Sequence, residues 1–251
     1  MIGAKAERMD RHHATSADTR AAIKADLAGR PCVLAFSAGK DSIAAWLALR
    51  ELGVEVRPVY KFLVPGLAFV ERSLAYYEKH FGTPIARIPH PSLFRWLRNL
   101  TFQAPEHCRI LEEFDPLEPT QADGSEIAAR AVGLELGRTW IATGVRAADS
   151  PMRRIALKKH GAINPTLRQF WAVWDWTKAD VLDAIRREGV KLPADYRIWG
   201  RSFDGLDARF LVPLAKHYPD DYKRVLEWFP LAELEVRRHG WQEERAAAAR
   251  G

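Results

Sequence analysis

The segment 33-VLAFSAGKDSIAAWLAL-49 places six small or polar residues, 37-SAGKDS-42, between two apolar runs. The first run is short enough for a buried strand. Residues 41–52 have the pattern of a helix that is apolar nearly all round, and Gly53 closes it. The hexapeptide therefore lies where a strand ends and a helix begins.

A loop in this position suits an anion, because ligands of open parallel sheets bind beyond the carboxyl ends of strands and helix N-termini favour negative charge. Gly39 lets the backbone approach a phosphate closely, and Lys40 adds a positive charge. Asp41 can cap the helix or hold Mg²⁺, and the hydroxyls of Ser37 and Ser42 can donate hydrogen bonds. The loop does not match the Walker A pattern. A strand–helix turn capped by serine and aspartate is the alternative interpretation.

The rest of the chain alternates between strand and helix patterns. Apolar segments predict strands at 54–60, 85–88, 139–143 and 170–176. The helical spacing of Val70, Leu74, Tyr77 and Phe81 predicts a helix that ends at Gly82. Asp123 and Glu126 have capping-box spacing and predict a helix over 124–136. Thr177 and Asp180 have the same spacing and predict a helix that ends at Gly189. This alternation is typical of parallel βαβ units. The predicted fold class is α/β, with a mostly parallel twisted sheet, helices on both faces and a C-terminal helical segment.

We expect three consecutive parts: an N-terminal helical segment (1–30), the α/β domain (31–190) and a C-terminal helical cap and tail (191–251). Apolar residues make up 47% of the 251 residues, which is enough for a core. No apolar run approaches the roughly 20 residues of a membrane span, and the first 20 residues lack the apolar core of a signal peptide. We therefore expect a soluble, cytoplasmic protein with no membrane partner, and its oligomeric state stays open.

The cysteine count and the charge narrow the function classes. Two cysteines, Cys32 and Cys108, cannot form a disulfide framework, which fits a reducing cytoplasm, and they exclude an ordinary iron–sulfur cluster within one chain. The formal charge of +6 suits an anionic ligand such as a nucleotide or nucleic acid. A surface with scattered arginines explains the same charge without any such ligand.

A second polar loop, 143-TGVRAADSPMRR-154, follows the predicted strand at 139–143. Gly144 at a strand end, followed by the guanidinium groups of Arg146 and Arg153, offers planar and permanently charged forks for phosphate oxygens. We expect this loop to face the first one across the strand ends. The alternative is a basic surface loop that pairs with Asp149 or other nearby acids.

Both loops resemble motifs of a known superfamily. The hexapeptide S-A-G-K-D-S resembles the S-G-G-x-D-S pyrophosphate loop of the adenine nucleotide alpha-hydrolases, the PP-loop ATPases, with Ala38 in place of the first glycine. Residues 143–154 resemble the T-G-x-R-x-x-x-S-x-x-R signature of the phosphoadenosine phosphosulfate (PAPS) reductase branch, with Ser150 at the serine position. The resemblance covers roughly residues 30 to 210.

The chain departs from that branch at its reactive end. A sulfonucleotide reductase needs a nucleophilic cysteine near its C-terminus, and this chain has no cysteine after Cys108. The segment 61-KFLVPGL-67 also stands where relatives often have Asp-Thr-Gly. The resemblance is therefore to a PAPS reductase-like bacterial or phage protein that lacks the reductase cysteine.

The resemblance implies an ATP pyrophosphatase or adenylyltransferase, an AMP-forming transferase that uses ATP, or a PAPS-like nucleotide, with Mg²⁺. In that scheme Lys40, Arg146 and Arg153 are catalytic and Asp41 helps to hold the metal. The nucleotide-binding set is Ser37, Ala38, Gly39, Lys40, Asp41, Ser42, Gly144, Arg146, Ser150 and Arg153. We expect Arg146→Ala to stop pyrophosphate release and to leave the fold intact.

The sequence does not identify the acceptor or the sulfur or nitrogen donor. The resemblance implies a role in sulfur transfer or in nucleic-acid modification. A partner protein is another possible acceptor. Two alternatives remain. One is a nucleotide-binding module without chemistry. The other is a nucleic-acid-associated module, in which the basic balance and Trp171, Trp174, Trp176 and Trp199 would supply phosphate contacts and stacking.

Overall fold

The computed structural model describes residues 12–114 and 116–248, and these divide into two compact units. Unit 1 takes the chain up to Lys61, then Leu74–Ile88 and Thr120–Leu192. Unit 2 takes Phe62–Ser73, Pro89–Pro119 and the chain from Pro193 onward. Each unit is thus assembled from separate segments, whereas the three-part division with boundaries at 30 and 190 stays a prediction.

A sheet forms the centre of unit 1. Within the described residues it has six strands in the order β3-β2-β1-β4-β6-β5. Pairing is parallel between β1 and β2, β1 and β4, and β4 and β6, and it is antiparallel between β5 and β6. The strands are β1 (Cys32–Ala35), β2 (Val56–Phe62), β3 (Ala86–Pro89), β4 (Ile141–Thr143), β5 (Ile163–Asn164) and β6 (Gln169–Trp171). The predicted α/β class with a mostly parallel sheet is confirmed.

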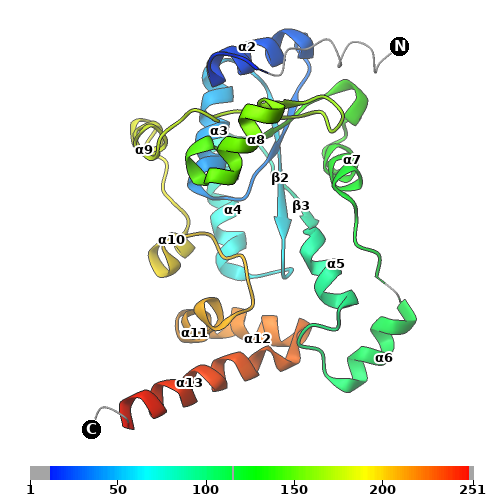
Figure 1. Cartoon of the computed structure of the whole chain (residues 1–251), viewed down its shortest axis with the longest axis vertical. Helices are drawn as coiled ribbons and strands as arrows, with labels where there is room; N and C mark the ends of the chain where they lie inside the picture. The colour runs from blue at the N-terminus through cyan, green and yellow to red at the C-terminus, as the bar shows by residue number, and fades with distance from the viewer. Residues whose placement is uncertain (1–11, 115, 249–251) are drawn as a thin grey trace. The chain divides into compact units, whose positions relative to one another are not determined.

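Helices cover both faces of this sheet. On one face α7 (Gln121–Ala131) packs on Val33, Val59 and Ile141 through Ala128 and Ala129. On the other side of β2 lies α3 (Lys40–Glu51), which packs against α9 (Lys178–Arg187) (Figure 1). Burial of eight consecutive residues in α3, Ser42 to Leu49, explains why its sequence is apolar nearly all round. The remaining elements of unit 1 include α2 (Ser16–Leu27), η1 (Leu136–Arg138), η2 (Ala147–Asp149) and α8 (Pro151–His160).

Two predicted elements differ from the structure. The helix expected at 124–136 is α7, which begins after Thr120, because Thr120 and Asp123 form the capping box, and it ends before Gly133, whose φ is +72°. Those hydrogen bonds from Thr120 also lower the pKa of Asp123. The strand expected at 170–176 ends at Trp171, and the chain then turns. The turn brings the Trp174 carbonyl to the Ala147 amide at 2.7 Å, which a continuing strand could not do.

Unit 2 is helical. Its core gathers Phe69, Phe210, Leu214 and Phe229 with neighbouring apolar side chains. Asp221 accepts hydrogen bonds from the first amides of α4 (Ala68–Phe81), a helix within which the boundary between the units falls. The other helices of unit 2 are α5 (Pro91–Arg98), α6 (Pro105–Phe114), α10 (Ala194–Trp199), α11 (Ala208–His217), α12 (Pro219–Trp228), η3 (Pro230–Ala232) and α13 (Glu233–Ala248). None of the described helices combines the length and the apolar character that crossing a membrane requires.

Cys32 should be inert to thiol reagents in the folded protein. It is fully buried in β1, and this burial raises the pKa of its thiol from 9.0 to about 12. Because the folded state holds the thiol proton more tightly, this contribution to stability is complete below pH 9.0 and is lost as the pH rises from there towards about 12. In a Cys108→Ser variant, Ellman's reagent should find no fast-reacting thiol until guanidinium unfolds the chain. Fast reaction of the native variant would contradict this assignment.

Candidate functional site

The two polar loops meet at the point where the order of the strands reverses. Strand β1 has β2 on one side and β4 on the other, and the loops leave the carboxyl ends of β1 and β4. A Cβ at Gly144 would lie 2.5 Å from the backbone carbon and oxygen of Asp41 and 2.7 Å from the Ser42 nitrogen. A reversal of strand order, at the carboxyl ends of the strands, is the usual place of ligand sites in open α/β sheets.

Hydrogen bonds shape the first loop without capping α3. The N-cap of α3 is Gly39, which is extended at φ −73° and has no side-chain cap. The Ser42 hydroxyl donates to the Gly39 carbonyl at 2.9 Å, and the Gly39 amide donates to the Ser37 hydroxyl at 3.3 Å. The serine–aspartate cap of the alternative interpretation is therefore not formed. An N-terminus with no capping side chain suits an anion.

Ala38 has a backbone conformation that favours glycine. Its φ is +58°, and it is one of the few non-glycine residues with positive φ in the described chain. The left-handed region costs an L-residue about 1–2 kcal/mol. Ala38 thus has the backbone conformation that suits the first glycine of the motif, and its backbone is strained as a result.

Ala38→Gly is expected to stabilise the protein modestly. Relief of about 1–2 kcal/mol of left-handed strain is offset by the larger unfolded-state entropy of glycine, about 0.4–1 kcal/mol, which leaves a small net gain. Urea unfolding measures it. The control is Ala44→Gly inside α3, which should cost about 0.5–1 kcal/mol. If both variants lose stability equally, the strain at Ala38 is absent.

Arg146 joins the two loops. Its side chain is buried, and Nε lies 2.7 Å from Oδ1 of Asp41 while Nη2 lies 2.7 Å from Oδ1 of Asp149. Nη1 donates to the carbonyl oxygen of Trp176 at 3.3 Å. Asp41 also pairs with Lys40 at 2.6 Å. One guanidinium therefore fixes the position of the second loop relative to the first.

The contact between Arg146 and Asp41 is an ion pair without hydrogen-bond geometry. Although Nε and Oδ1 are 2.7 Å apart, both atoms are buried and neither makes a hydrogen bond. The opposite charges compensate one another at this distance, although neither atom has a directed hydrogen bond. A ligand that supplied an acceptor to Nε, or a cation to Oδ1, would satisfy them.

The remaining predicted residues also gather here. Ser150 caps α8 by accepting from the Arg153 amide at 3.2 Å, and Arg153 pairs with Asp149 at 2.8 Å. The pairing with Asp149 that the alternative interpretation requires is thus present. It coexists with the convergence of the loops, which that interpretation does not require.

Lys61 lies at the same edge of the sheet, and the sequence motifs did not single it out. It is near the carboxyl end of β2, and its amine would lie 3.5 Å from a Cβ at Gly124 in α7. Burial lowers its pKa, and no ion pair joins it to an acid within the described ranges. The sequence could have indicated this residue, because Lys61 directly follows the apolar segment predicted as a strand at 54–60.

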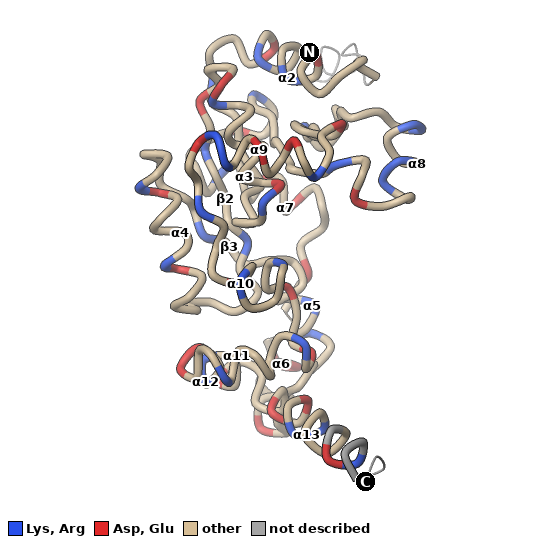
Figure 2. Tube along the Cα trace, turned by 90° about the vertical axis from the view of Figure 1, so that its left-hand side faces the viewer, with Lys and Arg blue, Asp and Glu red and all other residues tan. Residues whose placement is uncertain are grey.

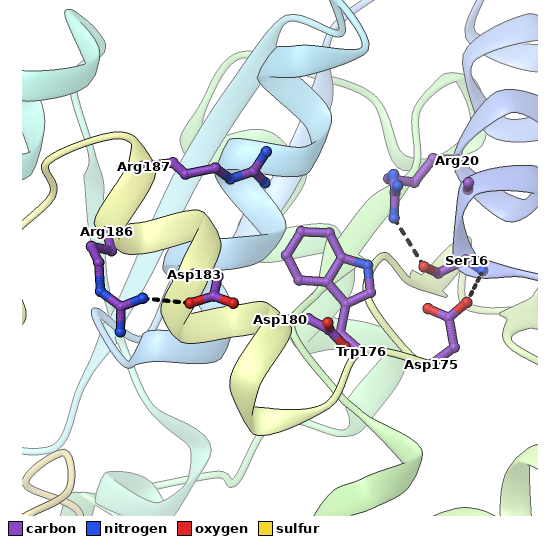
Figure 3. A pocket seen from close by; sticks show the side chains of 9 residues that line it. Ser16, Arg20, Asp175, Trp176, Asp180, Asp183, Arg186 and Arg187 are labelled. Carbon is purple, nitrogen blue, oxygen red and sulfur yellow. Dashed lines mark hydrogen bonds and ion pairs between the residues drawn. The ribbon is translucent and has the colours of Figure 1, made fainter.

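A cavity of about 790 Å³ is lined by residues outside both loops (Figure 3). Its residues come from α2, α9 and the turn after β6, and the Trp176 indole lies between Arg20 and α9. None of them belongs to either loop, and the link to the site is the Trp176 carbonyl that accepts from Arg146. The cavity is lined by Ser16, Ala17, Arg20, Asp175, Trp176, Asp180, Asp183, Arg186 and Arg187.

Comparisons with known proteins give only distant similarities. No protein-family model matches the chain, and no curated protein does. Among solved structures, an NH3-dependent NAD synthetase from Campylobacter jejuni is similar at 11% identity and a TM-score of 0.45, covering 96% of this chain and 95% of that one. A predicted subunit of a tRNA methyltransferase from Methanocaldococcus jannaschii is similar at 15% identity and a TM-score of 0.36, covering 76% and 92%. At these levels neither similarity assigns a family, a ligand or an activity to this chain.

Proposed function

We propose that this chain is a PP-loop protein that binds ATP and releases pyrophosphate while transferring the adenylyl group. The observation that supports this most is the close approach of the Gly144 backbone to Asp41 and Ser42 at the carboxyl ends of β1 and β4. That contact puts an uncapped helix N-terminus and three cationic side chains, those of Lys40, Arg146 and Arg153, at one edge of the sheet.

In the proposed complex, the Ser37–Ser42 loop holds the β- and γ-phosphates with backbone N–H groups and hydroxyls. Lys40 exchanges its contact with Asp41 for a phosphate oxygen. Arg146 and Arg153 stabilise the charge that develops on the α-phosphate and on the leaving pyrophosphate. Catalysis then rests on positioning and on fixed charges rather than on a protein nucleophile.

Asp41 fits a role in holding Mg²⁺. Its Oδ1 is a buried carboxylate oxygen without a hydrogen bond, and Mg²⁺ usually takes one or two carboxylates together with phosphate oxygens. No cluster of three or more His, Cys, Asp or Glu side chains occurs among residues 12–114 and 116–248, so most ligands would come from the nucleotide and water. When bound, the ion would neutralise phosphate charge.

Within the superfamily, the proposal favours the PAPS reductase-like branch without reductase chemistry. The second loop carries the residues of that branch's signature, including Ser150 and Arg153, at one place in the fold. With no cysteine after Cys108, an adenylated or sulfur-bearing acceptor would have to be attacked by another molecule.

The test is a panel of ATP, adenosine phosphosulfate and PAPS, each with and without Mg²⁺. Thermal shift measures binding, and an enzyme-coupled assay measures pyrophosphate. Stabilisation by ATP with pyrophosphate release in the presence of an acceptor supports the proposal. Binding without pyrophosphate release over a broad acceptor panel would favour a non-catalytic nucleotide-binding module. Absence of binding by all three nucleotides would overturn the proposal.

A further inference from the structure

Helix α8 presents a basic surface, and the proposed nucleotide site uses only Arg153 of it. In its ten residues, 151-PMRRIALKKH-160, it has four Lys or Arg and no Asp or Glu, against a formal excess of +6 for the whole chain. None of its side chains is buried. Figure 2 shows these cations along α8, which continues directly from the Gly144–Ser150 loop.

Most of these charges are unpaired. Arg153 pairs with Asp149, whereas Arg154, Lys158 and Lys159 have no acidic partner among the described residues. The arginines of α13 differ, since Arg237 pairs with Glu233 at 3.0 Å and Arg238 pairs with Glu235 at 2.8 Å. Three of the four Lys and Arg charges of α8 are therefore not compensated by an acid of the described chain.

The stability of the helix itself does not explain this charge. Lys158, Lys159 and His160 in the last turn complement the helix dipole, but Arg153 and Arg154 in the first turn oppose it. Two large apolar side chains also lie in the open among the cations: Met152 is 72% exposed and Ile155 is 57% exposed. Cations that repel one another and have no acidic partner would be stabilised by a polyanion lying along the helix.

We propose that α8 binds the phosphodiester backbone of a nucleic acid, which is the acceptor of the adenylyl-transfer reaction. A nucleophilic oxygen or nitrogen of the nucleic acid forms a bond to the α-phosphorus of ATP and gives up its proton to solvent, while the bond to the β-phosphate breaks and pyrophosphate leaves. The helix is about 15 Å long, which equals about four steps of a nucleic-acid strand at about 3.4 Å each. Because α8 begins at the Ser150 cap, a strand lying along it has one end at the Arg146–Arg153 loop. The assignment of the nucleic acid as acceptor rests on the proposed function, whereas the binding surface does not.

The aromatic residues suggested by the sequence are less suited to this task. Trp174 donates its indole N–H to Thr19 at 3.2 Å, and Trp176 lies against Arg20. Both are half-buried. Recognition on α8 would thus depend on charge and shape rather than on base stacking, and it would be strongly dependent on salt.

The test compares two triple variants of the full-length protein. The first, Arg154→Gln with Lys158→Gln and Lys159→Gln, removes the unpaired cations of α8. The matched control, Lys223→Gln with Arg237→Gln and Arg238→Gln, removes three cations that are paired with acids. Fluorescence anisotropy with labelled single-stranded RNA, single-stranded DNA and duplex DNA, over a salt series, gives the affinity and its salt slope. Thermal shift with ATP is measured on the same proteins.

We expect the α8 variant to bind its preferred oligonucleotide at least about tenfold more weakly, with a salt slope lower by about 2, which corresponds to three phosphates at about 0.7 each. The control should match the parent, and the ATP shift should be unchanged in both. Equal binding by the α8 variant and the parent, or equal loss in the control, overturns the proposal. So does retention on anionic lipid vesicles with no oligonucleotide binding. Loss of oligonucleotide binding through α8 in a protein that shows no ATP shift would refute the proposed function and leave the surface assignment standing.

Discussion

Gly144→Ala is expected to destabilise the protein and to abolish nucleotide binding. The new methyl carbon would lie 2.5 Å from the Asp41 carbonyl group and 2.7 Å from the Ser42 nitrogen. These are backbone atoms at the start of α3, so they cannot rotate away, and either the loop or the helix must shift. Forcing a methyl group into such a contact costs about 1–3 kcal/mol, and this case should lie at the upper end.

Urea unfolding and calorimetric titration with ATP measure the two effects. Gly240→Ala in α13 is the matched control, because a Cβ there meets nothing within 4 Å. In a helix interior the same substitution should be neutral or stabilise by up to about 1 kcal/mol. A Gly144→Ala protein with the parent's stability and ATP affinity would show that the two loops do not need to touch.

The central strands β1 and β4 could be predicted because they are mostly buried on both faces. Such strands are short apolar runs bounded by polar loops, and 33-VLAF-36 differs from β1 by one residue at each end. Strand β5 has only two residues, Ile163 and Asn164, and leaves no periodic pattern. The segment 172–176 is apolar enough for a strand, but it turns, with the Trp176 amide donating to the Val173 carbonyl. The Trp174 carbonyl accepts from the Ala147 amide, a tertiary contact that local sequence does not encode.

The sequence could predict which residues form the candidate site, but not which of them contact one another. Gly39, Gly144 and Arg146 stand out as residue types at strand ends. Their juxtaposition depends on β1 and β4 being neighbours, which follows from the strand order and not from any motif. The strain at Ala38 was not foreseen, because a glycine-to-alanine difference in a motif looks mild until φ is known. The sequence also did not indicate where the separate segments of unit 2 begin and end, because the amino-acid composition does not change at those positions.

Arg146→Ala should have the largest effect on activity. Truncation removes the guanidinium that faces Asp41 and Asp149 and, in the proposed mechanism, the α-phosphate. Removal of one preorganised charge that acts on the transition state costs about 10²–10³-fold in turnover. Pyrophosphate release measured with saturating ATP should fall by that amount, and ATP affinity should fall with it because the second loop is no longer held against the first.

The same substitution should also lower stability, which revises the sequence-based expectation of an intact fold. The Arg146 side chain is only 6% exposed, and its removal leaves two carboxylates, 26% and 22% exposed, without their shared partner. Asp41 keeps Lys40 and Asp149 keeps Arg153, so we expect a loss of about 1–3 kcal/mol rather than unfolding. Arg130→Ala is the control, since its pair with Glu126 lies on the surface and should contribute less than about 0.5 kcal/mol.

Arg146→Lys separates the structural role from the catalytic one. Lysine keeps the charge but lacks the planar fork, so it can reach one carboxylate and cannot join both loops while contacting a phosphate. We expect it to recover part of the lost stability in urea and little of the lost turnover. If lysine restores turnover in full, Arg146 acts only as a local charge, and its planar fork is not needed for catalysis. If neither variant changes ATP affinity or pyrophosphate release, the nucleotide binds elsewhere and the role assigned to Arg146 is wrong.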